Sequence, residues 1–479
     1  MVTHLPRLVV TAPASGHGKT TVATGIMAAL RREGLAVGGF KVGPDFIDPG
    51  YHSLATGRPG RNLDPFLTSE SLVTPLLLHG AAAHGPTDVA VIEGVMGLFD
   101  GRIDHDGFAS TAHVASLTRS PVVVVVDVSH LSRTAAAIVH GLATFEPGLH
   151  VAGVVLNKAA SARHTREVRS ALEATGVPVL GVLPRDAGIE APSRHLGLVP
   201  AQERAEAAAT VDHLAERVAE HVDLAALLAV AHAAPPLGGM PWSPAAAISS
   251  AGYAAGPTRP RPVVAVAGGR SFTFRYTETD ELMRAAGLDP VVFDPLDDEA
   301  LPPGTAGLYL GGGFPEVHAE SLSSNGSMRQ SISRAVAGGM PTVAECAGML
   351  YLCRTVDGVP MVGALPLSAA MGPRLTLGYR TAVSVTDSVV AVDGQRVTGH
   401  EFHRTTVTAL SRAAGEPSPG WRLDGIPDGL ALDPAGTGRA TVHASYLHTH
   451  WAGHPALAAR FATAVHEHAR RPVAAAVTS

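Results

Sequence analysis

The chain has 479 residues, 46% hydrophobic and 16% charged, so it can form two or three globular domains and is not a disordered chain. Its formal net charge is −6, with no long basic or acidic run, which argues against nucleic acid or an anionic membrane as the main partner. Two cysteines, Cys346 and Cys353, exclude a disulfide framework and a cysteine-rich zinc module. We expect neither a signal peptide nor a membrane span, and therefore a cytoplasmic protein.

The first half of the chain alternates strand-like and helix-like segments. Short Val-rich runs, typical of parallel strands covered on both faces, occur at 8–12, 37–41, 89–92, 121–126, 151–156 and 177–183. Helical patterns separate them, as at 20–32 and 161–175. The alternation predicts an α/β domain over residues 1–230 with a doubly wound, mostly parallel sheet.

A change of composition marks the second half. Residues 231–262 are rich in Pro, Gly, Ala and Ser, which predicts a linker. A second α/β unit follows, with strands expected at 263–267, 308–310 and 341–344 and a first helix at 280–286. We place this second domain at residues 263–455 and a C-terminal helix and tail at 456–479.

The first strand leads into a phosphate-binding loop. Residues 13–21 read Pro-Ala-Ser-Gly-His-Gly-Lys-Thr-Thr, and their backbone N–H groups, with the helix N-terminus that follows, would bind phosphates. Lys19 would neutralise the β and γ oxygens, and the Thr20 hydroxyl would coordinate Mg²⁺. The candidate nucleotide-binding residues are Ser15, Gly16, His17, Gly18, Lys19, Thr20 and Thr21. Pro13 replaces the consensus glycine, and Ala14 replaces a second lysine of partition ATPases, which favours a synthetase over a membrane-cycling switch.

Polar residues follow several of the predicted strands, where ligands bind in doubly wound sheets. Asp45 and Asp48, in Gly-Pro-Asp-Phe-Ile-Asp, either hold Mg²⁺, face an electrophilic substrate or form a solvated turn. Glu93 ends an apolar strand in the Walker-B manner and is the expected Mg²⁺ partner, with Asp100 shortly behind it. Asn157, at another strand end, either reads the edge of a purine or belongs to an ordinary loop.

A second chemical site is predicted around Cys346. This cysteine lies between a short strand and a helix, as in a nucleophile elbow, and the helix N-terminus is expected to lower its pKa. The expected oxyanion donors are the backbone N–H groups of Gly312, Gly313 and Ala347. His448 is the candidate base. Triad glutaminases commonly carry His-x-Glu here, but His450 occupies the glutamate position, so we expect a Cys–His dyad whose orienting group is missing or comes from elsewhere.

Other residues near these motifs favour structural roles. Cys353, seven residues after Cys346, is interpreted as a buried core residue. Glu401 and His403 lack the spacing of a zinc site and are interpreted as residues that shape a glutamine pocket.

The two sites together resemble the cobyrinic and hydrogenobyrinic acid a,c-diamide synthases, in which a P-loop amide synthetase is fused to a glutamine amidotransferase domain. The matching stretches are 13–21, 41–49, 61–64, 93–101, 310–316, 344–352, 399–403 and 445–450. The resemblance implies ATP- and Mg²⁺-dependent amidation of two carboxylates of a corrin precursor through an acyl phosphate, with glutamine as the nitrogen donor, in cobalamin biosynthesis.

The resemblance also implies roles for individual residues. Cys346 would form a glutamyl thioester, with His448 as its acid and base. The residues implied for the metal are Thr20, Asp45 and Glu93, and those implied for the substrate and acyl phosphate are Asp45, Asp48, Asp64 and Asp100.

Three alternatives remain open from sequence. Cobyric acid synthase shares the architecture, but residues 45–49 and 93–101 fit the a,c-diamide synthases better. Nickel-sirohydrochlorin a,c-diamide synthase uses the same chemistry. A P-loop regulatory switch ATPase with an inactive amidase domain is disfavoured by the intact Cys346 and His448. The expected partners are small molecules (a corrin polycarboxylate, ATP and L-glutamine), and the oligomeric state stays open, with a homodimer as one alternative.

Overall fold

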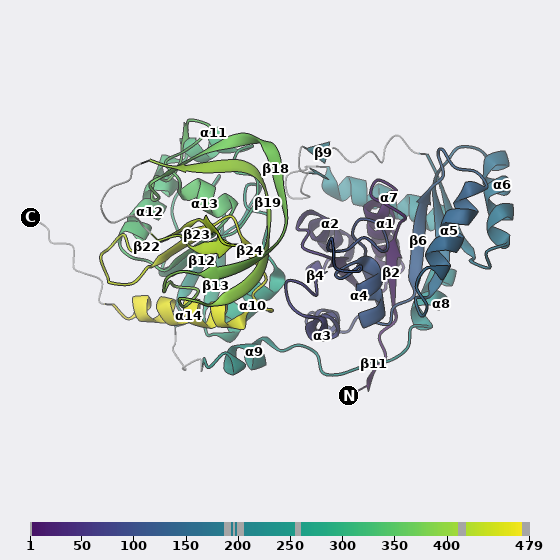
Figure 1. The fold of residues 1–479 in the computed structure, drawn as a ribbon, viewed down its shortest axis with the longest axis horizontal. Coiled ribbons are helices and arrows are strands. Elements are labelled where there is room, and N and C mark those ends of the chain that lie inside the picture. Colours follow the sequence, from purple (N-terminus) through teal and green to yellow (C-terminus); the bar gives the residue numbers. More distant parts are fainter. Residues whose placement is uncertain are drawn as a thin grey trace, which may run out of the picture. The chain divides into compact units, whose positions relative to one another are not determined.

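The computed structural model describes residues 2–185, 206–253, 260–410 and 418–471, and the strand backbone at 193–194 and 197–198 (Figure 1). The chain forms two compact units, Met1–Trp242 and Ser243–Ser479, each described by itself below. Within the described ranges, no helix combines the length and the apolar character that crossing a membrane requires.

A seven-stranded parallel sheet forms the centre of the first unit, in the order β4-β3-β5-β2-β6-β7-β8. Its strands are β2 (Arg7–Thr11), β3 (Val37–Val42), β4 (Arg61–Leu63), β5 (Val89–Glu93), β6 (Val122–Asp127), β7 (Val151–Ala159) and β8 (Val179–Pro184). Every residue of β2, β3 and β5 is buried, because helices cover both faces of the sheet. The doubly wound fold predicted from the Val-rich runs is confirmed.

The helices of the first unit follow the strands in alternation. They are α1 (Lys19–Arg32), α2 (Ile47–Thr56), α3 (Glu70–Ala82), α4 (Thr111–Leu117), α5 (Thr134–Thr144), α6 (Ala162–Glu173), α7 (Ala207–His221) and α8 (Leu224–His232). Both α1 and α8 pack on β2 and β5. The short strands β9 (Ser193–Arg194) and β10 (Gly197–Leu198) pair antiparallel with each other.

Much of the stretch predicted as a linker, 231–262, is folded. Strand β1 (Val2–Thr3) pairs antiparallel with β11 (Leu237–Gly238), and the buried Arg7 guanidinium donates to the Pro235 carbonyl at 2.7 Å. Helix α9 (Pro244–Ser250) packs against helices of the second unit. The boundary between the units therefore falls at Trp242, inside the predicted linker, whose residues 254–259 lie outside the described part of the chain.

The second unit is built on a six-stranded sheet, in the order β13-β12-β14-β15-β23-β22, parallel except for the edge strand β22. Its strands are β12 (Val263–Ala267), β13 (Asp289–Phe293), β14 (Thr305–Leu310), β15 (Thr342–Glu345), β22 (Leu430–Leu432) and β23 (Val442–Ser445). Its other helices are α10 (Thr277–Ala285), α11 (Ala319–Ser324), α12 (Gly326–Ala337), α13 (Ala347–Leu352) and α14 (Pro455–Ala469). Helix α14 contacts β14 and belongs to this unit, whereas residues 472–479 of the predicted tail lie outside the described part.

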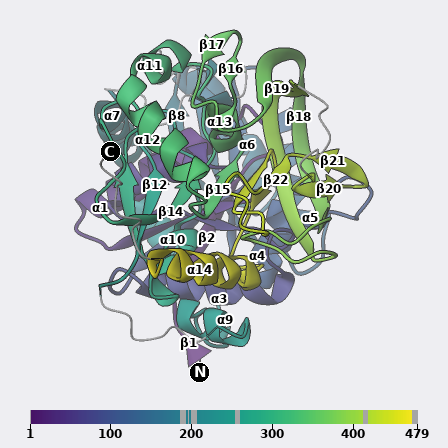
Figure 2. The same cartoon turned by 90° about the vertical axis from the view of Figure 1, so that its left-hand side faces the viewer.

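A second sheet in this unit was not among the predicted elements. The long strands β18 (Leu367–Ser384) and β19 (Arg396–Ala409) form an antiparallel hairpin, visible along one flank in Figure 2. The shorter strands of the sheet are β16 (Thr355–Val356), β17 (Val359–Pro360), β20 (Trp421–Leu423), β21 (Ile426–Asp428) and β24 (His448–Thr449). Strand β24 pairs with β19, and it carries the candidate base His448 into contact with this hairpin.

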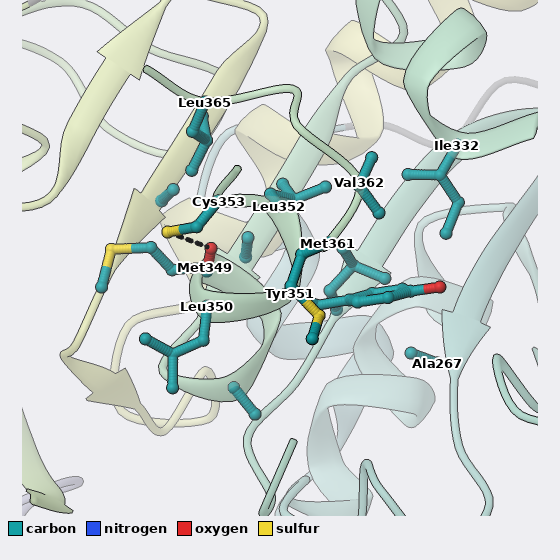
Figure 3. Close-up of a cluster of buried hydrophobic side chains, with 14 of the residues drawn as sticks. Ala267, Ile332, Met349, Leu350, Tyr351, Leu352, Cys353, Met361, Val362 and Leu365 are labelled. Carbon is teal, nitrogen blue, oxygen red and sulfur yellow. Dashed lines mark hydrogen bonds between the residues drawn. The ribbon is translucent and has the colours of Figure 1, made fainter. Parts of the chain in front are cut away.

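A hydrophobic core surrounds α13 and the segment after it (Figure 3). Cys353 is completely buried there, and its thiol donates to the Met349 carbonyl at 3.3 Å. The Tyr351 and Phe272 rings pack 5.6 Å apart in the same core. The interpretation of Cys353 as a core residue is confirmed, and burial raises the pKa of its thiol to about 12.

Candidate active sites

The phosphate loop joins β2 to α1, and two of its glycines adopt left-handed conformations. Gly16 has φ 85° and Gly18 has φ 89°, values that favour glycine. A Cβ atom at Gly18 would lie 2.3 Å from Nδ2 of Asn157, and this amide donates to the His17 carbonyl at 2.9 Å. Asn157 therefore holds the backbone of the phosphate loop, a contact that the sequence did not predict, and its purine contact stays a prediction.

The loop lysine is partly withdrawn from water. Its Nζ donates to the Ala14 carbonyl at 3.1 Å. Burial, followed by the positive charge of Lys41, lowers the pKa of Lys19 to about 8, against the opposing effects of Glu93, Asp48 and Asp100. An anionic phosphate would restore full protonation, so the site is suited to a polyphosphate ligand.

A buried ion-pair cluster lies next to the loop. The Lys41 ammonium lies 2.6 Å from Oδ2 of Asp48 and 2.9 Å from Oε1 of Glu93. The Thr20 hydroxyl donates to Oε1 of Glu93 at 2.6 Å, and His52 Nε2 lies 2.7 Å from Oε2 of Glu93. Although burial alone would raise the pKa of Glu93, Lys41 and His52 lower it, so this carboxylate is ionised. Sequence reasoning did not assign a role to Lys41 or His52.

Burial of the same cluster has different effects on Lys41 and Asp48. Although burial alone would lower the pKa of Lys41, Asp48 and Glu93 raise it, so the ammonium stays charged. Burial, with the negative charges of Asp45 and Glu93, raises the pKa of Asp48 well above its ordinary value. Lys41 therefore offsets part of the repulsion between Asp48 and Glu93, and it keeps Glu93 ionised without returning the pKa of Asp48 to its ordinary value.

The donor set at this point fits Mg²⁺. The Thr20 hydroxyl also lies 3.4 Å from Oδ2 of Asp48, so one hydroxyl and the carboxylates of Asp48 and Glu93 converge. Mg²⁺ takes oxygen ligands and usually keeps phosphate oxygens and waters among them. Among the described residues no group of three or more His, Cys, Asp or Glu is arranged to hold a metal ion by itself.

The Asp45 carboxylate accepts hydrogen bonds from the backbone at the start of α2. Its Oδ1 accepts the backbone N–H groups of Ile47 and Asp48, at 2.6 and 3.2 Å, and so stabilises the first turn of α2. Asp48, rather than Asp45, is the residue that joins Thr20 and Glu93. A role of Asp45 in metal binding stays a prediction, and Asp45 also lines a cavity of the first unit.

Of the two remaining predicted carboxylates, Asp64 is buried and Asp100 is exposed. Asp64 is only 1% exposed, and its Oδ1 accepts the N–H groups of Phe66 and Leu67 at 2.8 and 3.0 Å. Asp64 therefore stabilises the turn that follows β4, and the substrate contact implied for it stays a prediction. Asp100 is exposed, accepts the Gly97 N–H at 2.9 Å and raises the pKa of Lys19, so it lies within electrostatic reach of the phosphate loop.

A cavity of about 860 Å³ brings most of the predicted nucleotide residues together. Its lining includes Ser15, Gly16, Gly18, Lys19, Thr20, Thr21, Asp45, Asp48 and Asn157. His17 is not among the lining residues. Its ring Nδ1 accepts the Asp127 N–H at 2.9 Å, which ties the phosphate loop to the end of β6. The cavity has the size of a small-molecule site, and its lining includes charged side chains such as Lys19 and Asp48.

The second site centres on Cys346, between β15 and α13. Cys346 has φ 48°, a left-handed value that is uncommon outside glycine and typical of a strained strand-to-helix turn. Its N–H donates to the Ser445 carbonyl at 2.7 Å, which ties the turn to the end of β23. A Cβ at Gly348 would lie 2.2 Å from the Leu310 carbonyl oxygen, so Gly348 is the position that requires glycine, whereas position 347 accepts alanine.

The expected lowering of the Cys346 pKa is wrong. Burial raises it, the charges of Glu316, Glu345 and Asp428 raise it further, and the Ala347 N–H only partly opposes them. Helix α13 has six residues, and the burial of the thiol outweighs the influence of its N-terminus. The resting thiol is neutral and needs a base before it can act as a nucleophile.

His448 lies at the same edge of the sheet as Cys346. It follows β23 by three residues, and the Ser445 carbonyl at the end of β23 accepts the Cys346 N–H. Its ring stacks on His400 with centroids 4.9 Å apart and planes 15° apart. Burial, and then the neighbouring His400, lower the pKa of His448 well below its ordinary value, so its imidazole is neutral and can accept a proton.

The glycine run after β14 has a packing reason. A Cβ at Gly312 would lie 2.4 Å from Cε1 of His448. The Gly312 N–H donates to the Phe274 carbonyl at 3.1 Å, so in this conformation it cannot serve as an oxyanion donor. The N–H groups of Gly313 and Ala347 remain as predicted donors.

His450, at the position of the glutamate in His-x-Glu, lies in a buried polar cluster. His450 Nε2 lies 3.7 Å from Oε2 of the buried Glu278, and its ring packs 4.3 Å from Tyr276. The Tyr276 hydroxyl lies 3.2 Å from Nε2 of His400. Sequence reasoning missed Tyr276 and Glu278, since nothing in the spacing of α10 relates them to residue 450.

A P-loop unit followed by a unit with a cysteine nucleophile elbow defines the class of amide synthetases that carry their own amidotransferase. Residues 8–199 match the CobQ/CobB/MinD/ParA nucleotide binding domain, and residues 263–456 match the CobB/CobQ-like glutamine amidotransferase domain. The chain belongs to the a,c-diamide synthase family. It is 62% identical to the hydrogenobyrinate a,c-diamide synthase of Thermobifida fusca, over 96% of this chain and 97% of that protein.

Two further relatives also match this chain over nearly its whole length. The hydrogenobyrinate a,c-diamide synthase of Streptomyces coelicolor is 51% identical over 95% of this chain and 97% of the relative. The cobyrinate a,c-diamide synthase of a Synechococcus strain is 40% identical, with the same 95% and 97% coverage. The resemblance recognised from motifs therefore extends along both units.

Proposed function

We propose that this protein uses ATP and glutamine to convert the a and c carboxylates of hydrogenobyrinate into amides. The observation that carries the proposal is the 62% identity, across both units, to a relative named for that reaction. Five relatives named for hydrogenobyrinate are 50–62% identical, whereas three relatives named for cobyrinate are 36–40% identical, which favours the metal-free corrin as substrate.

The first unit would carry out the activation step. A carboxylate oxygen of the substrate attacks the γ-phosphorus of ATP, the bond to the ADP oxygen breaks, and an acyl phosphate forms. Lys19 would bind the β and γ oxygens, with the loop N–H groups around them. Thr20, Asp48 and Glu93 would hold Mg²⁺, which neutralises phosphate charge when bound. Lys41 would keep Asp48 and Glu93 in place. Ammonia then attacks the acyl carbon and inorganic phosphate leaves.

The second unit would supply the ammonia. The Cys346 thiol gives its proton to His448 as the sulfur attacks the carboxamide carbon of glutamine. The proton passes to the leaving nitrogen, ammonia departs, and the thioester is hydrolysed by water to glutamate. The Ala347 and Gly313 N–H groups would stabilise the oxyanion of each tetrahedral intermediate.

The test is mass spectrometry of hydrogenobyrinic acid and cobyrinic acid, each incubated with the protein, ATP, Mg²⁺ and glutamine. Each amidation replaces a hydroxyl by an amino group, so a product carrying two such replacements is expected, formed faster from hydrogenobyrinic acid. An a,c-diamide of cobyrinic acid is incubated in the same way, and four amidations of this diamide would instead identify a cobyric acid synthase. ATP hydrolysis without any amidation of either macrocycle would contradict the proposal.

A further inference from the structure

Glu345, directly before Cys346, is a buried carboxylate to which sequence reasoning gave no role. It is 7% exposed at the end of β15. Its Oε2 accepts the Tyr309 hydroxyl at 2.9 Å. Its Oε1 accepts the Thr449 hydroxyl at 2.7 Å and the Thr449 N–H at 3.3 Å.

These contacts join three segments of the amidase site. Tyr309 lies in β14, two residues before the glycine run. Thr449 lies in β24, directly after His448. Glu345 itself precedes the nucleophile, so a single side chain is bonded to the strands that carry the oxyanion loop and the base.

The contacts are enclosed by aromatic side chains. The Trp451 indole N–H donates to the Thr449 hydroxyl at 3.2 Å, and the Trp451 and Tyr309 rings pack edge to face at 5.4 Å. Burial raises the pKa of Glu345 to about 7, against the hydrogen bonds from Thr449 and Tyr309. Burying a carboxylate here costs folding free energy, and an apolar residue of similar volume would cost less. The hydrogen bonds of Glu345 therefore indicate that it holds neighbouring segments in position.

We propose that Glu345 is a positioning residue for glutamine hydrolysis, which holds the strand of His448 and the strand of the glycine loop against the Cys346 turn. The inference rests on the proposed function of Cys346 as the nucleophile. The positioning matters because displacements of about 1 Å between reacting groups can reduce a rate by about 100-fold.

Two substitutions at this position separate hydrogen bonding from charge. Glu345→Gln keeps an oxygen for Thr449, and its amide N–H can donate to the Tyr309 hydroxyl. Glu345→Ala removes every contact. With glutamine as donor, we expect Glu345→Ala to lower kcat about 100-fold while KM for glutamine changes less than about 3-fold. We expect Glu345→Gln to retain kcat within about 5-fold of the native enzyme.

Thr449→Val and Tyr309→Phe are the matched variants on the partner residues, and they test the inference even if Glu345→Ala does not fold. Each removes one hydroxyl donor, and we expect each to lower glutamine-dependent kcat about 5- to 10-fold. Adding Tyr309→Phe to Glu345→Ala should cause no further loss, because the contact between these two side chains is already gone.

Three results would overturn the inference. They are an unchanged kcat in Glu345→Ala, a Glu345→Gln variant as slow as Glu345→Ala, and an equal loss of glutamine- and ammonia-dependent synthesis, which would indicate a general structural role. Failure of the proposed function is a separate outcome: it would appear as glutamine-dependent synthesis that persists in Cys346→Ala, whatever the Glu345 variants do.

Discussion

Both candidate active sites contain buried ionisable groups, but these groups are charged in the first unit and neutral in the second. In the first unit, Lys41 lies within 2.9 Å of both Asp48 and Glu93, and the pairing keeps Lys41 and Glu93 charged. In the second unit, burial dominates, so the Cys346 thiol and the His448 imidazole are both neutral at rest.

The difference follows from the chemistry that each site would perform. Phosphoryl transfer needs fixed charges and oxygen ligands before the substrate arrives, and a buried ion-pair cluster provides them. Thiol attack needs a proton transfer, which a neutral thiol and a neutral base can carry out when glutamine binds.

The largest expected effect is on the nitrogen donor. Cys346→Ala should lower glutamine-dependent diamide synthesis by about 10⁴-fold or more, because no other group can form the thioester. Synthesis with ammonium chloride should be retained, since the first unit is unchanged. Product formation with each donor, followed by mass spectrometry, measures both. A parallel loss with ammonia would show that the two sites are not separable in this way.

Lys19→Ala should remove activity with both donors, by about 10³-fold, because the transferred phosphoryl group loses its main positive charge from the protein. Arg133→Ala, at an exposed position paired loosely with Glu167 at 3.8 Å, is the matched control and should leave both activities unchanged. Diamide synthesis retained by Lys19→Ala with ammonia would count against the phosphate loop as the ATP site.

Lys41→Met should destabilise the first unit by about 3 to 5 kcal/mol, because it leaves buried carboxylates without their cation. Urea unfolding measures the change in the free energy of unfolding. Arg32→Met is the comparison, since Arg32 forms an exposed pair with Asp212 and its loss should hardly be measurable. A loss below about 1 kcal/mol in Lys41→Met would mean that the cluster is not held by charge pairing.

Local signals predicted the elements and missed the long-range contacts. The Val-rich runs and the Gly-His-Gly-Lys-Thr loop report residues adjacent in sequence, so the parallel sheet, the phosphate loop and Cys346 at its turn were all expected. Two features of the sites depend on how separate segments pack. Asp48 lies beside the Thr20 hydroxyl, and the Gly312 N–H donates to the Phe274 carbonyl and is not available to an oxyanion. The Cys346 pKa was misjudged for the same reason, because burial is set by the tertiary structure and the helix N-terminus is local.

The smallest effect concerns the resting state of Cys346. Because burial raises the pKa of this thiol, the rate of alkylation by iodoacetamide should keep rising with pH through pH 9, above the ordinary cysteine pKa of about 8.5, without a plateau. At pH 7 the rate should be about 10-fold or more below that of free cysteine. Mass spectrometry of the modified peptide separates Cys346 from the buried Cys353, and Cys346→Ala provides the background. A plateau below pH 7 would mean that Cys346 rests as a thiolate beside a protonated His448, and the second unit would then hold charged groups ready for reaction, as the first one does.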